Sequence, residues 1–223
     1  MQFRHEVKHE ITHHDMLILR QRLRAVMQPD RFAVDGRYEI RSLYFDNLDD
    51  KALREKLDGV NIREKYRIRF YNNDHSDIKL ERKFKHGGLG YKETANLTVE
   101  QAQAIAKGDV EWMSRSTDDV ILGFYTRIRN EGLRAKVIVD YTREPFVFAP
   151  GNVRVTLDHG IRTGISCTDF LSTDCMTVPI EGSPCILEVK WDSYLPDVIR
   201  DIIQLEGRHS GAFSKYAACR MYD

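Results

Sequence analysis

Five segments of the chain alternate between charged and apolar side chains, and no other feature constrains the fold as strongly. The segments are residues 3–11, 62–71, 78–85, 153–159 and 186–191. In residues 62–71 the charged positions include Arg63, Lys65, Arg67 and Arg69, and mainly apolar residues stand between them. Successive side chains of a β-strand point to opposite faces of a sheet. The pattern therefore predicts an antiparallel sheet with one apolar face and one charged face.

Helices are expected between these strands, covering the apolar face. They are predicted at residues 12–27, 47–57, 98–107, 118–130 and 194–205, with a short one after residue 211. Further strands are expected at residues 37–46 and 136–147, and a flexible loop at residues 86–90 that serves as a hairpin connection. Strands dominate, and no stretch of sequence reads as a linker. We therefore expect an α+β fold in which residues 1–223 form a single domain.

The overall charge limits the classes of partner. The 34 basic and 34 acidic residues balance, so the molecule as a whole should not be attracted to nucleic acid. No apolar run approaches the ~20 residues that span a bilayer, and the charged N-terminus lacks the apolar core of a secretory signal. The four cysteines follow no metal-binding spacing. These features predict a cytoplasmic protein with reduced thiols.

The charged face of the predicted sheet is the feature that points to function. It lies either in open solvent or inside a closed barrel, where two like charges ~6 Å apart at an effective dielectric constant of ~20 cost about 3 kcal/mol. A polyanionic ligand would offset this repulsion, because Arg binds phosphate through paired hydrogen bonds and Lys supplies a mobile positive charge. Glu81 and Glu188 would then form internal salt bridges or hold a divalent metal on phosphate oxygens.

Several short motifs resemble, in the same order, the VTC branch of the triphosphate tunnel metalloenzyme superfamily, the catalytic domain of the vacuolar transporter chaperone polyphosphate polymerases. The motifs are Ser42-Leu43-Tyr44-Phe45-Asp46, Arg67-Ile68-Arg69, Glu81-Arg82-Lys83, Arg154-Val155-Thr156-Leu157-Asp158, Leu187-Glu188-Val189-Lys190 and Phe213-Ser214-Lys215-Tyr216. The first strand lacks the ExExK pattern of the CYTH branch. The resemblance implies a closed antiparallel β-barrel of about eight strands that forms a triphosphate tunnel, with helices packed outside.

The resemblance also implies which residues act. Roles in catalysis are implied for Arg67, Arg69, Lys83, Arg154 and Glu188. Glu188 also matches the family's metal-binding carboxylate, with Mn²⁺ or Mg²⁺ as cofactor. Further substrate contacts are implied for Lys8, Lys92, Arg162, Ser214 and Lys215. The same phosphates are expected to contact three further lysines of the charged faces, Lys79, Lys85 and Lys190.

The implied activity is that of a polyphosphate polymerase, a phosphotransferase that moves the γ-phosphate of ATP onto a growing polyphosphate chain. Such a reaction depends on positioning and charge neutralisation more than on covalent work by the protein. Two alternatives stay open: a hydrolase of the same fold acting on tripolyphosphate or nucleoside triphosphates, and a polyphosphate-binding module without activity. The expected partners are ATP and polyphosphate. A separate membrane partner is an option, and the oligomeric state is left open.

Overall fold

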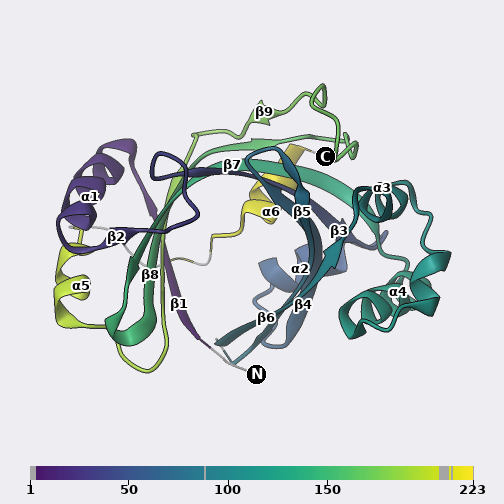
Figure 1. The fold of residues 1–223 in the computed structure, drawn as a ribbon, viewed down its shortest axis with the longest axis horizontal. Helices are drawn as coiled ribbons and strands as arrows, with labels where there is room; N and C mark the ends of the chain where they lie inside the picture. The colour runs from purple at the N-terminus through teal and green to yellow at the C-terminus, as the bar shows by residue number, and fades with distance from the viewer. Residues whose placement is uncertain (1–3, 88, 206–210, 212, 223) are drawn as a thin grey trace. The chain divides into compact units, whose positions relative to one another are not determined.

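The strands form antiparallel ladders, as the alternation predicts. The computed structural model describes residues 4–87, 89–205, 211 and 213–222. Its long strands are β1 His5–Ile11, β3 Tyr38–Asp46, β4 Arg63–Tyr71, β5 Asp74–His86, β6 Leu89–Leu97, β7 Arg134–Phe148, β8 Val153–Thr163 and β10 Cys185–Trp191 (Figure 1). Two short strands, β2 Gln28–Pro29 and β9 Val178–Pro179, pair with β7 and β8 respectively.

The helices begin where the sequence offers capping side chains. They are α1 His13–Val26, α2 Lys51–Leu57, α3 Val99–Lys107, α4 Asp119–Glu131, α5 Asp197–Ile202 and α6 Lys215–Cys219, with 3₁₀ turns η1 Glu111–Arg115, η2 Pro150–Asn152 and η3 Arg220–Tyr222. Thr12 and Thr98 form capping boxes, and Asp118 caps α4. In the described ranges, no helix combines the length and the apolar character needed to cross a membrane.

The chain divides into two compact units, each built from separate segments of the sequence. The first unit comprises Met1–Glu39, Tyr141–Ile161 and Pro179–Phe213. The second comprises Ile40–Asp140, Arg162–Val178 and Ser214–Asp223. Each unit has its own run of paired strands and its own hydrophobic core.

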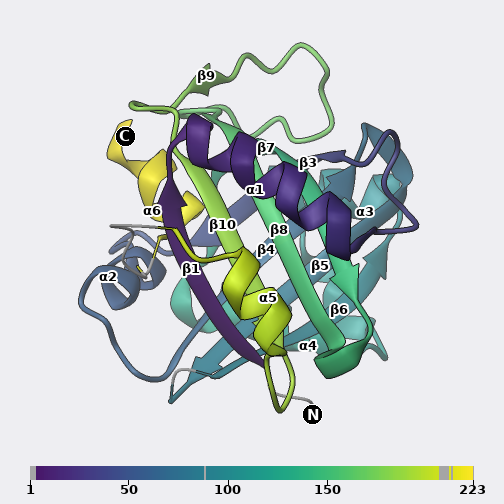
Figure 2. The same cartoon turned by 90° about the vertical axis from the view of Figure 1, so that its left-hand side faces the viewer.

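In the first unit the strand order is β1-β10-β8-β7. β10 pairs antiparallel with both β1 and β8. Two helices, α1 and α5, lie along the apolar face of these strands (Figure 2). The fully buried residues there include Met16, Leu19 and Leu23 of α1, Val155 and Leu157 of β8, Val189 of β10 and Ile199 of α5. The apolar face of this unit is thus covered by helices, which leaves its charged face for other roles.

A tight turn joins β7 to β8 in the first unit, and it requires glycine. Gly151 has a φ of 72°, and a Cβ there would lie 2.5 Å from the backbone oxygen of Tyr194. We expect Gly151→Ala to lower the free energy of unfolding by about 1–3 kcal/mol beyond the cost of the left-handed conformation itself. Gly182→Ala is the matched control, because Gly182 has a φ of 70° with no atom within 4 Å of the added Cβ. Equal losses in melting temperature for the two variants would contradict this packing.

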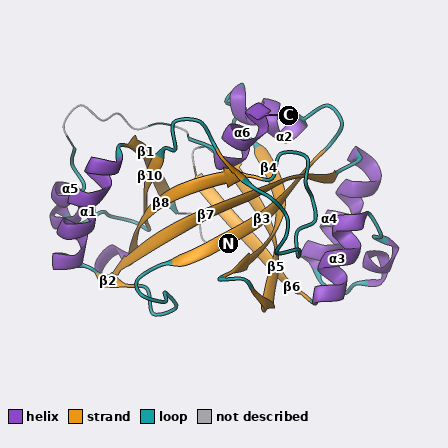
Figure 3. Ribbon diagram, turned by 90° about the horizontal axis from the view of Figure 1, so that it is seen from above, coloured by secondary structure: helices purple, strands orange, loops and turns teal. Residues whose placement is uncertain are grey.

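In the second unit the strand order is β7-β3-β4-β5-β6. The helices α3 and α4 lie against the apolar face of β5 and β6 (Figure 3). Phe124 of α4 stacks on Tyr66 of β4 with ring centroids 4.7 Å apart. Ile68, Leu80 and Phe124 are fully buried. The second unit therefore also places its charged face away from its helix-covered core.

The α+β class and the antiparallel pairing are confirmed, whereas closure into a barrel is not shown. In the described residues β1 pairs with β10 alone, and β6 pairs with β5 alone. Each unit therefore ends in a strand with one edge outside the ladder. Most predicted elements agree with the structure within a few residues, among them the helices at 12–27, 98–107 and 118–130.

The hairpin connection predicted at residues 86–90 is present but shorter than predicted, and the strand that follows it was not predicted. Residues Leu89 to Leu97 form β6, which pairs with β5 in unbroken register from Ile78↔Leu97 to His86↔Leu89. Gly87 has a φ of 58°, the conformation that a tight hairpin turn needs, and Gly88 lies outside the described residues. The glycines therefore mark the turn of a hairpin. Two helices are also shorter than predicted: α2 begins at Lys51 and α5 ends at Ile202.

Candidate functional site

The charged face of the second unit gathers basic side chains from three neighbouring strands. Lys65, Lys83 and Lys92 stand opposite one another on β4, β5 and β6, and Arg67 stands opposite Glu81. Residues directly opposite on neighbouring strands point to the same face. The second-unit cluster consists of Lys65, Arg67, Arg69, Lys79, Glu81, Lys83, Lys85 and Lys92. The structure therefore brings together the sequence-predicted residues of β4, β5 and β6.

Glu81 is the buried counter-ion of the second-unit cluster. Its side chain is 1% exposed, and its two oxygens lie 2.5 Å from Arg67 Nη2 and 2.7 Å from Lys92 Nζ. Burial opposes ionisation of Glu81, but Arg67, Arg69 and Lys92 outweigh it and hold the pKa of this carboxyl well below its usual range. Glu81 thus forms the internal salt bridge that was one of its two predicted roles.

Arg67 and Arg69 of β4 are held rigidly. Arg67 is 6% exposed and Arg69 is 3% exposed. Arg67 donates through Nε to Glu81 at 2.6 Å, and Arg69 donates through Nε to the hydroxyl of Ser42 at 2.9 Å. Hydrogen bonds of this kind fix the planar guanidinium in one orientation. The pair is thus preorganised, which is the arrangement that recognition of a phosphate group requires.

A second charged cluster lies in the first unit, around Glu188 of β10. The first-unit cluster consists of Glu6, Lys8, Arg143, Asp158, Glu188 and Lys190. Glu188 is 4% exposed, ion-pairs with Lys190, and lies 3.5 Å from Lys8 Nζ. Lys8 also lies 2.8 Å from Glu6. Burial lowers the pKa of Lys8, but Glu188 and Glu6 outweigh it and raise that pKa above its usual value.

Arg143 belongs to the first-unit cluster, although the sequence analysis did not select it. Its guanidinium donates through Nε and Nη2 to the two oxygens of Asp158, both at 2.6 Å, and lies 3.8 Å from Glu188. Burial disfavours the charge of Arg143, yet Asp158 and neighbouring groups raise its pKa well above the usual value. The sequence does carry a signal for Arg143. In the strand predicted at 136–147, the residues at the alternate positions that share its face are apolar, and Arg143 is the charged residue among them.

Four predicted site residues form their contacts with residues outside these two clusters, although one of them, Arg154, stands opposite Lys190 of the first-unit cluster in the strand register. Arg154 of the first unit pairs with Asp30 at 2.8 Å. In the second unit, Arg162 donates through Nε to the Thr177 hydroxyl at 2.9 Å. Ser214 uses its hydroxyl to cap α6, and Lys215 is the first residue of that helix. The structure therefore gives these four residues structural contacts, and their roles toward phosphate stay predictions.

The described residues contain no group of three or more His, Cys, Asp or Glu side chains spaced to hold a metal ion. A single carboxylate is nevertheless a fitting ligand for Mg²⁺ in a phosphate site, because Mg²⁺ is commonly held by one or two carboxylates together with substrate phosphates. Glu188 is a candidate of this kind, since its carboxylate lies among the cations of Lys8, Lys190 and Arg143. The donor chemistry of Glu188 therefore fits a metal that arrives with its phosphate ligand.

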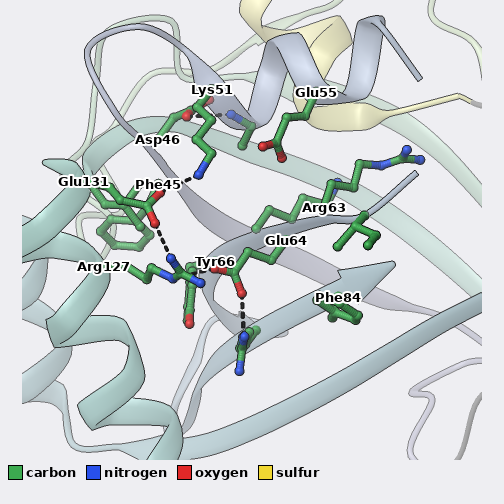
Figure 4. A pocket seen from close by; sticks show the side chains of 15 residues that line it. Phe45, Asp46, Lys51, Glu55, Arg63, Glu64, Tyr66, Phe84, Arg127 and Glu131 are labelled. Atoms are coloured by element: carbon green, nitrogen blue, oxygen red, sulfur yellow. Dashed lines mark hydrogen bonds and ion pairs between the residues drawn. The ribbon is translucent and has the colours of Figure 1, made fainter. Parts of the chain in front are cut away.

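A pocket of about 190 Å³ lies in the second unit between α2, α4 and β4 (Figure 4). Its charged residues pair with one another: Lys51 with Glu131, Arg127 with Glu64 and Glu131, and Arg82 with Glu64. Tyr66 and Phe84 contribute apolar surface to it. Within the described part of the chain, none of the predicted substrate residues lines this pocket. Lys65 is the member of the second-unit cluster that also lines this pocket.

Comparison with known proteins identifies the family. The family model of the VTC domain matches residues 3–222. Among solved structures, a Bacillus halodurans protein described as a candidate adenylate cyclase gives a TM-score of 0.50 at 15% identity, over 85% of this chain and 80% of that chain. The protein PH1012 from Pyrococcus horikoshii gives a TM-score of 0.43 at 13% identity, over 90% and 85% of the two chains. A search of curated proteins finds no match.

These findings carry different weight. At 15% identity the likeness to the Bacillus halodurans protein concerns the fold alone. The VTC model, in contrast, spans nearly the whole sequence, including every motif on which the resemblance rests. The resemblance inferred from the sequence is therefore confirmed: the chain belongs to the VTC domain family.

Proposed function

We propose that this protein is a metal-dependent polyphosphate polymerase that transfers the γ-phosphate of ATP to a growing polyphosphate chain inside a basic tunnel. The observation that supports this most strongly is the second-unit cluster, in which Arg67 and Arg69 are preorganised beside lysines from three strands. Such an arrangement suits a linear polyanion, because the charges repeat along the strands. Membership of the VTC domain family supports the same proposal.

The proposed mechanism assigns binding and charge neutralisation to the basic residues. Arg67 and Arg69 orient the phosphates through their fixed hydrogen-bond donors, and Lys83 and Lys92 neutralise the charge that develops on the transferred group. The attacking oxygen belongs to a phosphate that is already ionised at neutral pH, so no strong general base is needed. The proposal extends the same binding role to Arg154, Arg162, Ser214 and Lys215.

Glu188 is the residue that would hold the metal. A divalent ion there would neutralise charge on the phosphate oxygens and help to orient the reacting groups. Lys8 and Lys190 contact Glu188 in the structure, and the proposal requires both ammonium groups to turn toward the incoming phosphates. Lysine suits this exchange because its charge sits at the end of a flexible side chain.

Two further parts of the proposal concern the setting of the enzyme. We place the protein in the cytoplasm, where ATP is available and where Cys167, Cys175, Cys185 and Cys219 would remain reduced. Residues 1–223 are proposed to act as one functional domain. A hydrolase of the same fold and a binding module without activity are the competing proposals, because both would use the same basic residues.

A polymerisation assay separates the three proposals. The protein is incubated with ATP, Mn²⁺ and a short polyphosphate primer, and the products are run on a gel stained for polyphosphate while ADP release is followed. A ladder that grows with time together with ADP is the expected result. Free phosphate without a ladder would replace the polymerase with the hydrolase. Binding of tripolyphosphate without either product would leave the binding module.

A further inference from the structure

Tyr44 of β3 lies within the second-unit cluster, although neither the sequence motifs nor the proposed mechanism gives it a role. Its side chain is 3% exposed and stands opposite Arg67 in the strand register. Arg67 donates through Nη1 to the hydroxyl of Tyr44 at 2.8 Å. The ammonium of Lys65 and the guanidinium carbon of Arg67 each lie 5.7 Å from the centre of the Tyr44 ring. Tyr44 therefore contacts two of the cations that would bind phosphate.

The Tyr44 ring also packs against the C-terminal helix α6. Tyr216 stacks on Tyr44 with ring centroids 5.1 Å apart and an interplanar angle of 24°. Tyr216 donates its hydroxyl proton to Asp46 at 2.6 Å and accepts a hydrogen bond from Arg220 at 2.9 Å. Tyr44 is therefore held by both α6 and the guanidinium of Arg67, so its hydroxyl holds Arg67 in place.

The phenol of Tyr44 is placed to change its charge near neutral pH. Burial raises the pKa of Tyr44, but Arg67, Lys65 and Arg69 outweigh burial and lower it to about 8. The opposite holds for Tyr216, whose pKa is raised by burial and by Asp46. The other charged or titratable groups near this site are Glu81 and Lys83 on β5, Arg69 and Tyr71 on β4, and Asp46 and Arg220, which both bond to Tyr216.

We propose that Tyr44 is a positioning residue for Arg67 and that loss of its proton weakens polyphosphate binding at alkaline pH. The inference rests on the proposed function, because it takes phosphate to be the ligand of the second-unit cluster. The direction of the change in polyphosphate affinity follows from the charge of Tyr44. Neutral Tyr44 takes nothing from the positive charge that Glu81 leaves on Arg67, Lys65 and their neighbours, whereas the phenolate cancels part of it.

The test measures tripolyphosphate affinity by calorimetry for the wild type and for Tyr44→Phe, from about pH 7 to about pH 9.5. Above pH 8, affinity of the wild type is expected to fall by up to about tenfold per pH unit, because the ligand then favours the protonated protein. Tyr44→Phe should weaken binding at pH 7 and flatten the alkaline fall. Tyr66→Phe is the matched control, because Tyr66 lies on the opposite face of β4 and burial raises its pKa to about 12.

A second readout does not depend on binding. Ultraviolet absorption of tyrosinate, taken as the difference between wild type and Tyr44→Phe, should show one phenol that ionises near pH 8. A wild type that binds tripolyphosphate with the same alkaline profile as Tyr44→Phe would overturn the inference alone. A wild type that binds no tripolyphosphate at any pH would instead overturn the proposed function.

Discussion

Replacing Glu188 with Gln is expected to abolish turnover while leaving tripolyphosphate binding intact. The substitution keeps the size of the side chain and removes only the charge that would hold the metal. A catalytic metal supplies several kcal/mol of transition-state stabilisation, so the rate of ADP release should fall by at least about 100-fold. Binding measured without metal should not weaken, because the lost group is an anion that repels phosphate.

The control for this variant is Glu10→Gln, which removes an exposed carboxylate from the neighbouring strand β1. Its turnover should match that of the wild type. The melting temperature of Glu188→Gln is measured alongside, since Lys8 and Arg143 lose a partner in that variant. Unchanged turnover in a folded Glu188→Gln protein would refute the assignment of Glu188 to the metal.

Arg67→Lys should weaken tripolyphosphate binding by about tenfold, which corresponds to about 1.4 kcal/mol. Lysine retains the charge but cannot reproduce the fork that contacts both Glu81 and Tyr44. Arg67→Lys is preferred to Arg67→Ala, because alanine would remove the arginine that pairs with the buried carboxylate of Glu81. Removal of one partner from a buried ion pair commonly costs about 3–5 kcal/mol and could unfold the protein.

Arg82→Lys is the matched control for Arg67→Lys. Arg82 is the neighbour of Glu81 in sequence, but it lies on the opposite face of β5, where it pairs with Glu64 at 2.7 Å. The same chemical change there should leave tripolyphosphate affinity unaltered. If both variants bind as tightly as the wild type, Arg67 has no part in phosphate binding and the basic residues serve the fold alone.

The alternation of charged and apolar residues predicted the charged faces correctly. Successive side chains of a strand point to opposite faces of a sheet, whichever strands lie beside it. In β4 and β5 every residue lies on the face that the alternation predicts. This includes Glu64 and Arg82, two charged residues that the alternation places among the apolar side chains. Those two residues form an ion pair with each other, which explains why charged residues are tolerated there. The helices predicted at residues 12–27 and 98–107 also begin where predicted, since Thr12 and Thr98 form capping boxes there.

Tertiary contacts were harder to predict. The strand β6 was not predicted for two reasons. Its glycine was assigned to the connecting loop, and Glu93 stands among the apolar residues of one face, where it is tolerated because it pairs with Arg82 on β5. The start of α2 depends on Asp46, whose carboxylate accepts hydrogen bonds from the backbone of Ala52 and Leu53. These contacts depend on how neighbouring elements pack, which strand alternation and helix periodicity do not specify.

The same reason explains the gaps in the predicted site. Arg143 reaches the first-unit cluster through Asp158, a partner on the next strand of the sheet. Tyr44 contacts Arg67, which lies 23 residues away in the sequence. It also contacts Tyr216, which lies near the C-terminus. Residue type alone does not separate such a tyrosine from one in an ordinary core.

The most direct test of the central claim, that the basic clusters bind a polyphosphate, is the melting temperature of the protein with and without tripolyphosphate. At about 100 times the dissociation constant, a ligand of the folded state adds about 2.7 kcal/mol to the free energy of unfolding, which for a chain of this length raises the melting temperature by about 5–10 °C. Sulfate at matched ionic strength controls for salt. A rise with tripolyphosphate well beyond that with sulfate is the predicted result. Equal melting temperatures in the two salts would contradict the claim and mean that the charged faces are merely solvated.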